Sequence, residues 1–277
     1  MRELRGRVAV VTGAASGIGR ALAFELAREG AALALSDVDE AGLAETHAGA
    51  GAIGSRVTSE RVDVADRAAV HAHAERVVAE HSRVNLVINN AGVGLGATIS
   101  EMSYADLEWL FGINFWGVVR GTKAFLPHLK QASEGHLVNV SSVFGLIAVP
   151  GQGAYNAAKF AVRGFTECLR QELELEGVNV SATCVHPGGI QTNIARKARI
   201  VAREGRPSRE EMNALFDRMA RTTLEAAARA ILRGVKRNAR RVLIGADAHA
   251  IAALQRLLPT GYQALVVRLA RRSPIPP

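Results

Sequence analysis

Apolar and polar positions alternate in blocks along the chain, with apolar runs of about five residues separated by amphipathic segments of ten or more. Short apolar runs rich in β-branched residues are typical of strands, whereas the longer segments have the helical period. The pattern predicts seven strands, over residues 7–12, 32–36, 55–63, 84–89, 136–141, 178–185 and 241–244. It predicts helices over residues 17–29, 39–47, 66–81, 103–131, 152–176 and 224–238, with a further helix starting at Ser208.

The strands over residues 8–11 and 86–88 are apolar at every position, so both of their faces are expected to be buried. Strands of this kind alternating with helices predict an α/β fold, a doubly wound parallel sheet flanked by helices. No Gly-, Ser- or Pro-rich linker interrupts residues 1–245, which we interpret as a single domain. Residues 246–277 are predicted to form a C-terminal helical extension, whose apolar runs at 250–258 and 262–269 are separated at Pro259.

Composition excludes several classes of protein. The 277 residues are 48% hydrophobic and 22% charged, which is enough apolar material for a sizeable core and excludes disorder. The formal net charge of +8 is concentrated in residues 196–277, which hold 18 basic and 6 acidic residues. Aromatic residues make up only 5% of the chain and none lies within the basic run, so nucleic-acid binding is not expected.

Location and metal content are also constrained by the sequence. No stretch reaches the roughly 18 apolar residues of a membrane-spanning helix. The apolar run near the N-terminus is too short for a signal peptide, and there are only two cysteines, Cys168 and Cys184. We expect both cysteines to be small buried apolar residues. No Cys or His cluster has metal-ligand spacing, so we expect a cytoplasmic protein with neither disulfide nor metal site.

A glycine-rich turn follows the first predicted strand. Gly13, Gly17 and Gly19, with Ser16 and Ile18 between them, lie where that strand gives way to a helix. Such glycines allow a tight turn and a close approach of the backbone to a pyrophosphate, while the helix N-terminus faces the anion. The turn therefore predicts a dinucleotide site; a turn that binds nothing is the alternative.

The second predicted strand ends at Asp37, 24 residues after Gly13. A carboxylate near this offset can accept hydrogen bonds from the adenosine ribose, and its charge repels a 2′-phosphate. Asp37 thus favours NAD(H) over NADP(H). Alternatively, it caps the next helix, a role that Asp39 could also fill.

Further motifs occur in order along the chain: Asn89-Asn90-Ala91-Gly92, Asn114, Ser141-Ser142, Tyr155-Asn156-Ala157-Ala158-Lys159 and Pro187-Gly188. Together with the TGxxxGIG form of the glycine turn, they resemble the short-chain dehydrogenase/reductase family over residues 5–245. The resemblance implies a Rossmann-like fold and an NAD(P)-dependent oxidoreductase acting on CH–OH groups.

The resemblance also implies a role for each matching position. Tyr155 would be the catalytic acid or base, Lys159 its electrostatic partner and a ligand of the nicotinamide ribose, and Ser142 the residue that orients the substrate oxygen. Asn114 would hold a proton-relay water. The implied cofactor-binding residues are Gly13, Ser16, Gly17, Ile18, Gly19, Asp37, Asp63, Val64, Asn90, Ala91, Gly92, Tyr155, Lys159, Pro187, Gly188, Ile190 and Thr192.

Acid–base chemistry supports the Tyr155 assignment independently. Reduction of a ketone places negative charge on oxygen, so the site needs a proton donor of suitable pKa. A free phenol, with a pKa near 10, is too weak an acid, and a nearby ammonium lowers that pKa. Because Tyr155 and Lys159 are four residues apart on a helix, they share one face, and we expect Lys159 to make the phenol more acidic.

The segments expected around the substrate are apolar and include Val93, Phe144, Leu146 and Val149. They favour an uncharged secondary alcohol or ketone, although core packing explains half of these side chains equally well. Residues 193–220 are interpreted as a mobile lid that excludes water. The basic residues in the first part of this lid form either a solvated surface or a positively charged landing strip, that is, a surface that attracts a phosphate-bearing acyl thioester. They are Arg196, Lys197, Arg199, Arg203, Arg206 and Arg209.

The helical extension departs from the common family pattern, in which many members end soon after the seventh strand. Its apolar stripes beside arginines predict packing on a second subunit, in a dimer or tetramer, or over the active site; peripheral membrane contact is a third interpretation. His186 is expected to be structural or to line the pocket wall.

The leading hypothesis is an oxidoreductase that interconverts a secondary alcohol and a ketone; the alternatives are a 3-oxoacyl-thioester reductase and a nucleotide-binding regulatory protein with little turnover.

Overall fold

The computed structural model describes residues 1–201 and 208–272; Arg203 and Arg206 of the predicted lid lie outside the described residues. Seven strands form one parallel sheet in the order β3-β2-β1-β4-β6-β7-β9. The strands are β1 (Val8–Thr12), β2 (Ala32–Asp37), β3 (Val57–Arg61), β4 (Leu86–Asn89), β6 (Gly135–Val140), β7 (Val180–Pro187) and β9 (Arg241–Ile244). The sheet confirms the predicted doubly wound α/β fold.

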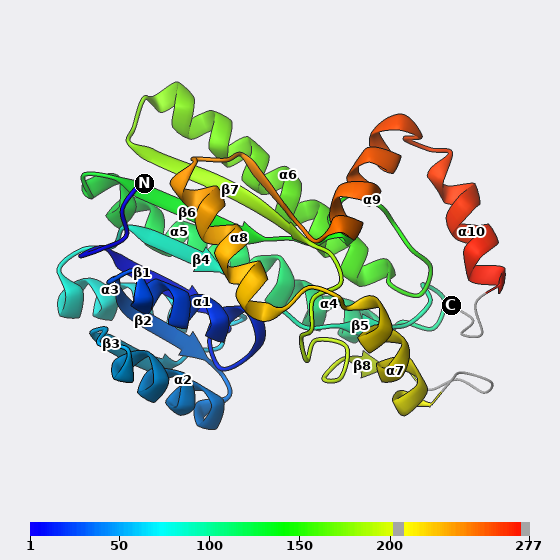
Figure 1. Ribbon diagram of the computed structural model, residues 1–277, viewed down its shortest axis with the longest axis horizontal. Coiled ribbons are helices and arrows are strands. Elements are labelled where there is room, and N and C mark those ends of the chain that lie inside the picture. Colours follow the sequence, from blue (N-terminus) through cyan, green and yellow to red (C-terminus); the bar gives the residue numbers. More distant parts are fainter. Residues whose placement is uncertain (202–207, 273–277) are drawn as a thin grey trace.

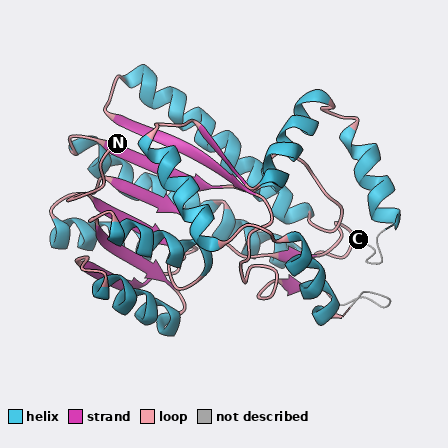
Figure 2. Ribbon diagram, in the orientation of Figure 1, coloured by secondary structure: helices cyan, strands magenta, loops and turns pink. Residues whose placement is uncertain are grey.

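Helices cover both faces of the sheet (Figures 1 and 2). One face packs against α1 (Gly17–Arg28), α2 (Glu40–Ala52) and α8 (Leu224–Lys236). The other face packs against α3 (Arg67–His81), α5 (Trp116–Gln131) and α6 (Gly153–Glu176), with α4 (Tyr104–Asn114) packed against α5 and α6. Strand residues alternate between the two cores, as Ala9 and Val10 do, which explains why the strands are apolar throughout.

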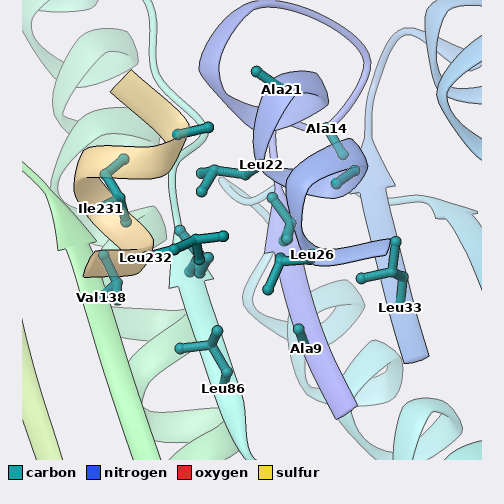
Figure 3. Packing of buried hydrophobic residues seen from close by; sticks show 14 of the residues in the cluster. Ala9, Ala14, Ala21, Leu22, Leu26, Leu33, Leu86, Val138, Ile231 and Leu232 are labelled. Carbon is teal, nitrogen blue, oxygen red and sulfur yellow. The ribbon is translucent and has the colours of Figure 1, made fainter. Parts of the chain in front are cut away.

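The core beneath α1 and α8 shows how the helical period is used. Figure 3 shows Leu22 and Leu26 of α1 and Ile231 of α8 in one core with Ala9, Leu86 and Val138 of the sheet, with Ile231 on the side of Val138. Leu22 and Leu26 are four residues apart, so they share the buried face of α1, and both are 0% exposed. Burying each leucine contributes about 2 kcal/mol of transfer free energy.

The connections reverse direction at the centre of the sheet. From β1 the chain moves outward to β2 and β3, whereas from β4 it moves outward on the other side to β6, β7 and β9. The loops that follow β1 and β4 therefore diverge from neighbouring strand ends. In open α/β sheets a ligand crevice forms at this kind of switch point, at the carboxyl ends of the strands.

The predicted helix over residues 103–131 is in fact two helices, which corrects the placement of Asn114 inside one long helix. Asn114 is the last residue of α4, and Phe115 separates α4 from α5 with φ −113° and ψ −58°. The side chain of Asn114 bonds to the backbone of Val93 at both its oxygen and its nitrogen. This tertiary contact fixes the end of α4, and the chain changes direction before α5 begins.

Smaller elements also differ from the predictions. A two-residue parallel pair, β5 (Leu95–Gly96) with β8 (Arg199–Ile200), lies apart from the main sheet and was not predicted. The helix α7 (Arg209–Met219) begins after Ser208 with a capping box, as predicted. In the extension, α9 (Ala246–Leu257) begins four residues before the predicted run, and α10 (Tyr262–Arg272) follows it.

The two cysteines differ in solvent exposure, which corrects the expectation that both are buried. Cys184 of β7 is buried, whereas Cys168 lies on the outer side of α6 and is exposed; neither forms a disulfide. Among the described residues no helix is both long and apolar enough to span a membrane.

Candidate functional site

The predicted site residues converge on one edge of the sheet. They lie at the carboxyl ends of the strands or just beyond them, or on α4 and α6, and Figure 1 shows β5, β8, α7, α9 and α10 beyond that same edge. Residues from segments far apart in the sequence are thereby brought together. The ends of β1, β2, β3, β4 and β7 and the loops that follow them hold most of the residues predicted to bind the cofactor, and Ser142 is the second residue after β6.

The glycine turn is packed too tightly for side chains at two positions. Gly13 has φ +67°, and a Cβ there would lie 2.8 Å from the Cα of Ala91. A Cβ on Gly19 would lie 2.0 Å from the carbonyl oxygen of Gly13. The side-chain amide of Asn90 donates to the carbonyls of Thr12 and Gly13, at 2.9 and 3.2 Å, and so holds the turn from the β4 side.

Thr12 is a site residue that the sequence reasoning missed. Its hydroxyl accepts hydrogen bonds from the backbone N–H groups of Asn90 and Ala91, at 3.0 and 3.1 Å. It therefore joins the loops that follow β1 and β4 at the switch point. The sequence signal was the threonine that opens the TGxxxGIG motif, to which the sequence reasoning assigned no role.

The first turn of α1 is open to an anion. Ser16 is the N-cap of α1, but its side chain makes no capping hydrogen bond, whereas Asp39 and Asp66 cap α2 and α3 with theirs. Backbone N–H groups and the helix dipole favour negative charge at such a terminus. The close-packed turn and the uncapped helix fit the pyrophosphate of a dinucleotide.

Asp37 is hydrogen-bonded to the glycine turn with which it was predicted to form the dinucleotide site. Its Oδ2 accepts from the N–H of Ala15 at 2.9 Å, and its Oδ1 accepts from the N–H groups of Val38 and Asp39 at 2.7 and 3.1 Å. The helix cap that was the alternative role is made by Asp39, which accepts from Gly42 at 3.1 Å. Asp37 therefore presents a fixed, partly exposed carboxylate beside the glycine turn.

Several predicted cofactor residues pack into the protein. Val64 is 8% exposed and packs against Gly117, where a Cβ would lie 2.8 Å from it, and Ile190 is 3% exposed in the core beneath α1. Asp63 is exposed, and its carboxylate accepts from the N–H of Ala65. Thr192 lies beside Gly17, and its methyl carbon would be 3.8 Å from a Cβ added at Gly17. Contact of these residues with a cofactor remains a prediction.

Gly92 leaves room between two of the predicted catalytic residues. A Cβ at Gly92 would lie 3.3 Å from Oδ1 of Asn114 and 3.6 Å from Nζ of Lys159. The Asn114 side chain is buried and occupied, because Oδ1 accepts from the N–H of Val93 at 2.8 Å and Nδ2 donates to its carbonyl at 2.9 Å. It holds the loop after β4, and its predicted water-holding role remains a prediction.

Ser142, Tyr155 and Lys159 come together at the start of α6. Ser142 follows β6, is 8% exposed, and accepts from the N–H of Phe144 at 3.1 Å. Nζ of Lys159 lies 5.6 Å from the centroid of the Tyr155 ring and donates to the carbonyl of Val140 at 2.9 Å. The four-residue spacing of Tyr155 and Lys159 thus places the ammonium beside the ring rather than on the hydroxyl.

The electrostatics of this group differ from the expectation that Lys159 acidifies the phenol. Burial raises the pKa of Tyr155 to about 12, while a hydrogen bond with Ser142 acts in the opposite direction. Burial lowers the pKa of Lys159 to about 8. Desolvation disfavours both charged forms, and the ammonium donates its hydrogen bond to the carbonyl of Val140. The cofactor-free protein therefore holds a neutral phenol that is a weaker acid than free tyrosine.

His186 contacts the backbone of Ser142 from the buried side of the site. It is fully buried in β7, and its Nδ1 donates to the carbonyl of Ser142 at 2.8 Å. Burial lowers the pKa of His186 to about 4, so the ring stays neutral. This position agrees with the structural role expected for His186.

The predicted substrate residues line up along the segment after β6 and the loop after β4. Phe144 stands edge-to-face with Tyr155, with centroids 6.2 Å apart, and Val93 packs in the small core that also holds Tyr155. Leu146 is 2% exposed, whereas Val149 is half-buried and its carbonyl accepts from Asn156. Phe144, Val93 and Val149 are accessible to a ligand, and Leu146 belongs to the packing beneath them.

The described basic residues in the first part of the predicted lid have protein partners. Arg196 pairs with Asp217 at 2.6 Å, and Lys197 pairs with Asp39 at 3.4 Å. The guanidinium of Arg199 lies 3.6 Å from the centroid of the Trp109 ring and also faces Asp106. Arg209 donates to backbone carbonyls of the same segment. Internal pairing favours the interpretation of these charges as a lid face over the phosphate landing strip.

The family model described as short chain dehydrogenase matches residues 7–201. The chain therefore belongs to the short-chain dehydrogenase family of oxidoreductases, which use NAD or NADP. Among curated proteins, it is 51% identical to the putative oxidoreductase SadH of Mycobacterium tuberculosis, over 96% of both chains. It is 34% identical to the 3-oxoacyl-[acyl-carrier-protein] reductase FabG of Thermotoga maritima, over 75% of this chain and 83% of FabG.

A solved structure similar to this one extends through the C-terminal helices. It is a short chain dehydrogenase/reductase from Burkholderia phymatum in complex with NAD, with a TM-score of 0.85 and 34% identity. The match covers 100% of this chain and 99% of the other. The helical extension is thus shared with a family member of known structure.

Proposed function

We propose that this protein is an NAD-dependent oxidoreductase that interconverts a secondary alcohol and a ketone, with Tyr155 as the acid or base. The observation that carries the proposal is the meeting of Ser142, Tyr155 and Lys159, together with a glycine turn that has no room for a Cβ at Gly13 or Gly19. A carbonyl oxygen between Ser142 and Tyr155 would be polarised by the serine hydroxyl and protonated by the phenol.

The chain's own residues divide the work of binding and proton transfer. The cofactor, when bound, supplies or accepts the hydride. Gly13, Gly19 and the open first turn of α1 would hold its pyrophosphate, and Asp37 its adenosine ribose. Lys159 would turn from the Val140 carbonyl toward the nicotinamide ribose, and its positive charge near the phenol would then lower the cost of forming a phenolate.

The preference for NAD over NADP rests on Asp37. Its carboxylate is held by three backbone N–H groups and therefore stays in place beside the ribose position. A 2′-phosphate at that position would meet a fixed negative charge. The Burkholderia phymatum relative, whose structure is a complex with NAD, supports the same choice.

An uncharged, apolar substrate fits the accessible side chains of Val93, Phe144 and Val149. Similarity to FabG favours a second candidate, reduction of a 3-oxoacyl thioester. The pairing of Arg196 and Lys197 with Asp217 and Asp39 leaves less free positive charge for a phosphate-bearing carrier, which favours the first candidate. A regulatory protein with little turnover would not need the Ser142, Tyr155 and Lys159 group.

We further propose a cytoplasmic homo-oligomer, a dimer or tetramer, made of one catalytic domain over residues 1–245 and the extension over 246–277. The lid would lie within residues 193–220. Apolar side chains are exposed on α9 and α10, among them Leu257, Leu265 and Leu269, and they supply surface for a second subunit or for peripheral contact with a membrane.

The proposal is tested by incubating the protein with NADH or NADPH and a panel of steroid, aliphatic, sugar and acyl-thioester ketones, and with the oxidised cofactors and the matching alcohols. We expect turnover with NADH and apolar ketones. Turnover only with acyl thioesters would replace the first candidate by the second. Cofactor binding without turnover of any compound would support the regulatory alternative.

A further inference from the structure

The helical extension touches the rest of the protein at few points. Among the described side chains of α10, Tyr262 is the only buried one, at 5% exposed, whereas Leu265, Val267 and Leu269 are each more than 40% exposed. Figure 1 shows α10 standing away from the sheet, beyond the strand ends. Val266 and Ala270 are partly buried, so Tyr262 is the most deeply buried contact among the described side chains of α10.

Tyr262 is bonded to the segment that carries the candidate catalytic serine. Its hydroxyl oxygen accepts a hydrogen bond from the N–H of Ala148 at 3.1 Å, across 114 residues of sequence. The segment from Ser142 to Val149, here called the substrate loop, contains Phe144, whose ring stands edge-to-face with Tyr155. Tyr262 thus joins the extension to the loop that frames the candidate site.

A second contact ties the start of the extension to the loop after β7. The carboxylate of Asp247 in α9 accepts from the N–H of Gly189 at 2.6 Å. It also fills the space where a Cβ on Gly188 would stand, 2.2 Å from the nearest carboxylate oxygen. The extension therefore holds two of the loops that surround the strand ends, one through Asp247 and one through Tyr262.

We propose that Tyr262 is a positioning residue, which fixes the substrate loop from the extension and thereby determines how the substrate fits against Phe144 and Tyr155. This role rests on the proposed function, because it requires a substrate at Tyr155. It acts through the loop backbone, since the hydroxyl contacts Ala148 and not the candidate catalytic residues. It assigns the extension a part in substrate binding within one subunit.

Hydrogen exchange tests the contact without requiring turnover. Tyr262→Phe removes the acceptor and keeps the ring, and Tyr104→Phe removes the same hydroxyl from a side chain that is 86% exposed. Losing one hydrogen bond should speed amide exchange in the peptide that contains Ala148 by about fivefold in Tyr262→Phe. Exchange equal to that of Tyr104→Phe would overturn the proposal.

Steady-state kinetics test the consequence. With the best ketone of the panel, Tyr262→Phe should raise the ketone KM by about fivefold, the same factor as is expected for amide exchange. The kcat and the KM for NADH should change less than twofold. A residue that only stabilises the fold would lower the melting temperature and leave the ketone KM unchanged, which would overturn the proposal. Absence of turnover in the unmodified protein would overturn the proposed function, and the exchange result would still decide whether Tyr262 holds the loop.

Discussion

Burial of the Lys159 amine predicts a stability cost that depends on pH. Lys159 is 3% exposed, and burial lowers its pKa from the ordinary 10.5 to about 8. Between these two values the unfolded chain binds more protons than the folded protein, so this residue makes stability rise with pH. The substitution Lys159→Met keeps a long side chain in the same space and removes the titrating group.

The size of the effect follows from the two pKa values. The lowered pKa of the buried amine costs about 3 kcal/mol of stability at pH 7, where the folded amine is protonated, and about 1 kcal/mol at pH 9.5, where folding releases its proton. Burial raises the pKa values of Tyr155 and Cys184 to about 12, so these groups act in the opposite direction at high pH, but both proteins contain them. The difference in unfolding free energy between Lys159→Met and the unmodified protein should therefore shrink by about 2 kcal/mol from pH 7 to pH 9.5.

The assay is urea unfolding of the cofactor-free proteins at a series of pH values from 7 to 9.5. Lys123→Met is the matched control, because Lys123 is exposed on α5 and its removal should leave the pH dependence unchanged. If the difference between Lys159→Met and the unmodified protein stays constant across this range, the amine is not desolvated. The account of the pKa values in the site would then be wrong.

The remaining predictions concern the cofactor loops. Asp37→Asn keeps an acceptor and removes the charge, so the ratio of kcat/KM for NADP to that for NAD should rise by about fivefold; an unchanged ratio would remove Asp37 from the ribose site. Gly19→Ala places a Cβ 2.0 Å from the carbonyl of Gly13 and should raise the NADH Kd by about tenfold in a fluorescence titration, whereas Gly164→Ala, which meets nothing within 4 Å, should not. Asn114→Ala leaves the Val93 backbone without its partners and should lower the free energy of unfolding by about 2 kcal/mol; urea unfolding with no such loss would show that the contact is dispensable.

The sheet and the glycine turn could be predicted because their causes are local. The strands are apolar at successive positions because helices cover both faces of the sheet, and this leaves a direct pattern in the chain. Gly13 and Gly19 are glycines because the turn itself has no room for a Cβ. Motif spacing likewise placed Tyr155 and Lys159 on one face of α6.

The break between α4 and α5 could not be predicted, because its cause lies outside the segment. No proline or glycine pair marks Phe115, and the helix ends where Asn114 bonds to Val93, 21 residues earlier in the chain. The same holds for Tyr262 and Asp247. A tyrosine at the start of a helix and an aspartate in a first turn give no local signal of partners at Ala148 and Gly189.

The pKa values show a further limit. Sequence spacing predicted that Lys159 would make the phenol acidic, but spacing contains no information on desolvation. In the cofactor-free fold burial raises the pKa of Tyr155, and the ammonium is bonded to Val140 instead. The proposed acid–base partnership would therefore require Lys159 to turn away from the Val140 carbonyl when the cofactor binds.

The central claim is that the hydroxyl of Tyr155 exchanges a proton with the substrate oxygen beside a bound nicotinamide. The most direct measurement compares ketone reduction and NADH binding in the unmodified protein, Tyr155→Phe and Tyr104→Phe. We predict that Tyr155→Phe loses turnover by at least about a thousandfold while its NADH Kd changes less than threefold, and that Tyr104→Phe behaves like the unmodified protein. Turnover in Tyr155→Phe within tenfold of the unmodified rate would contradict the account.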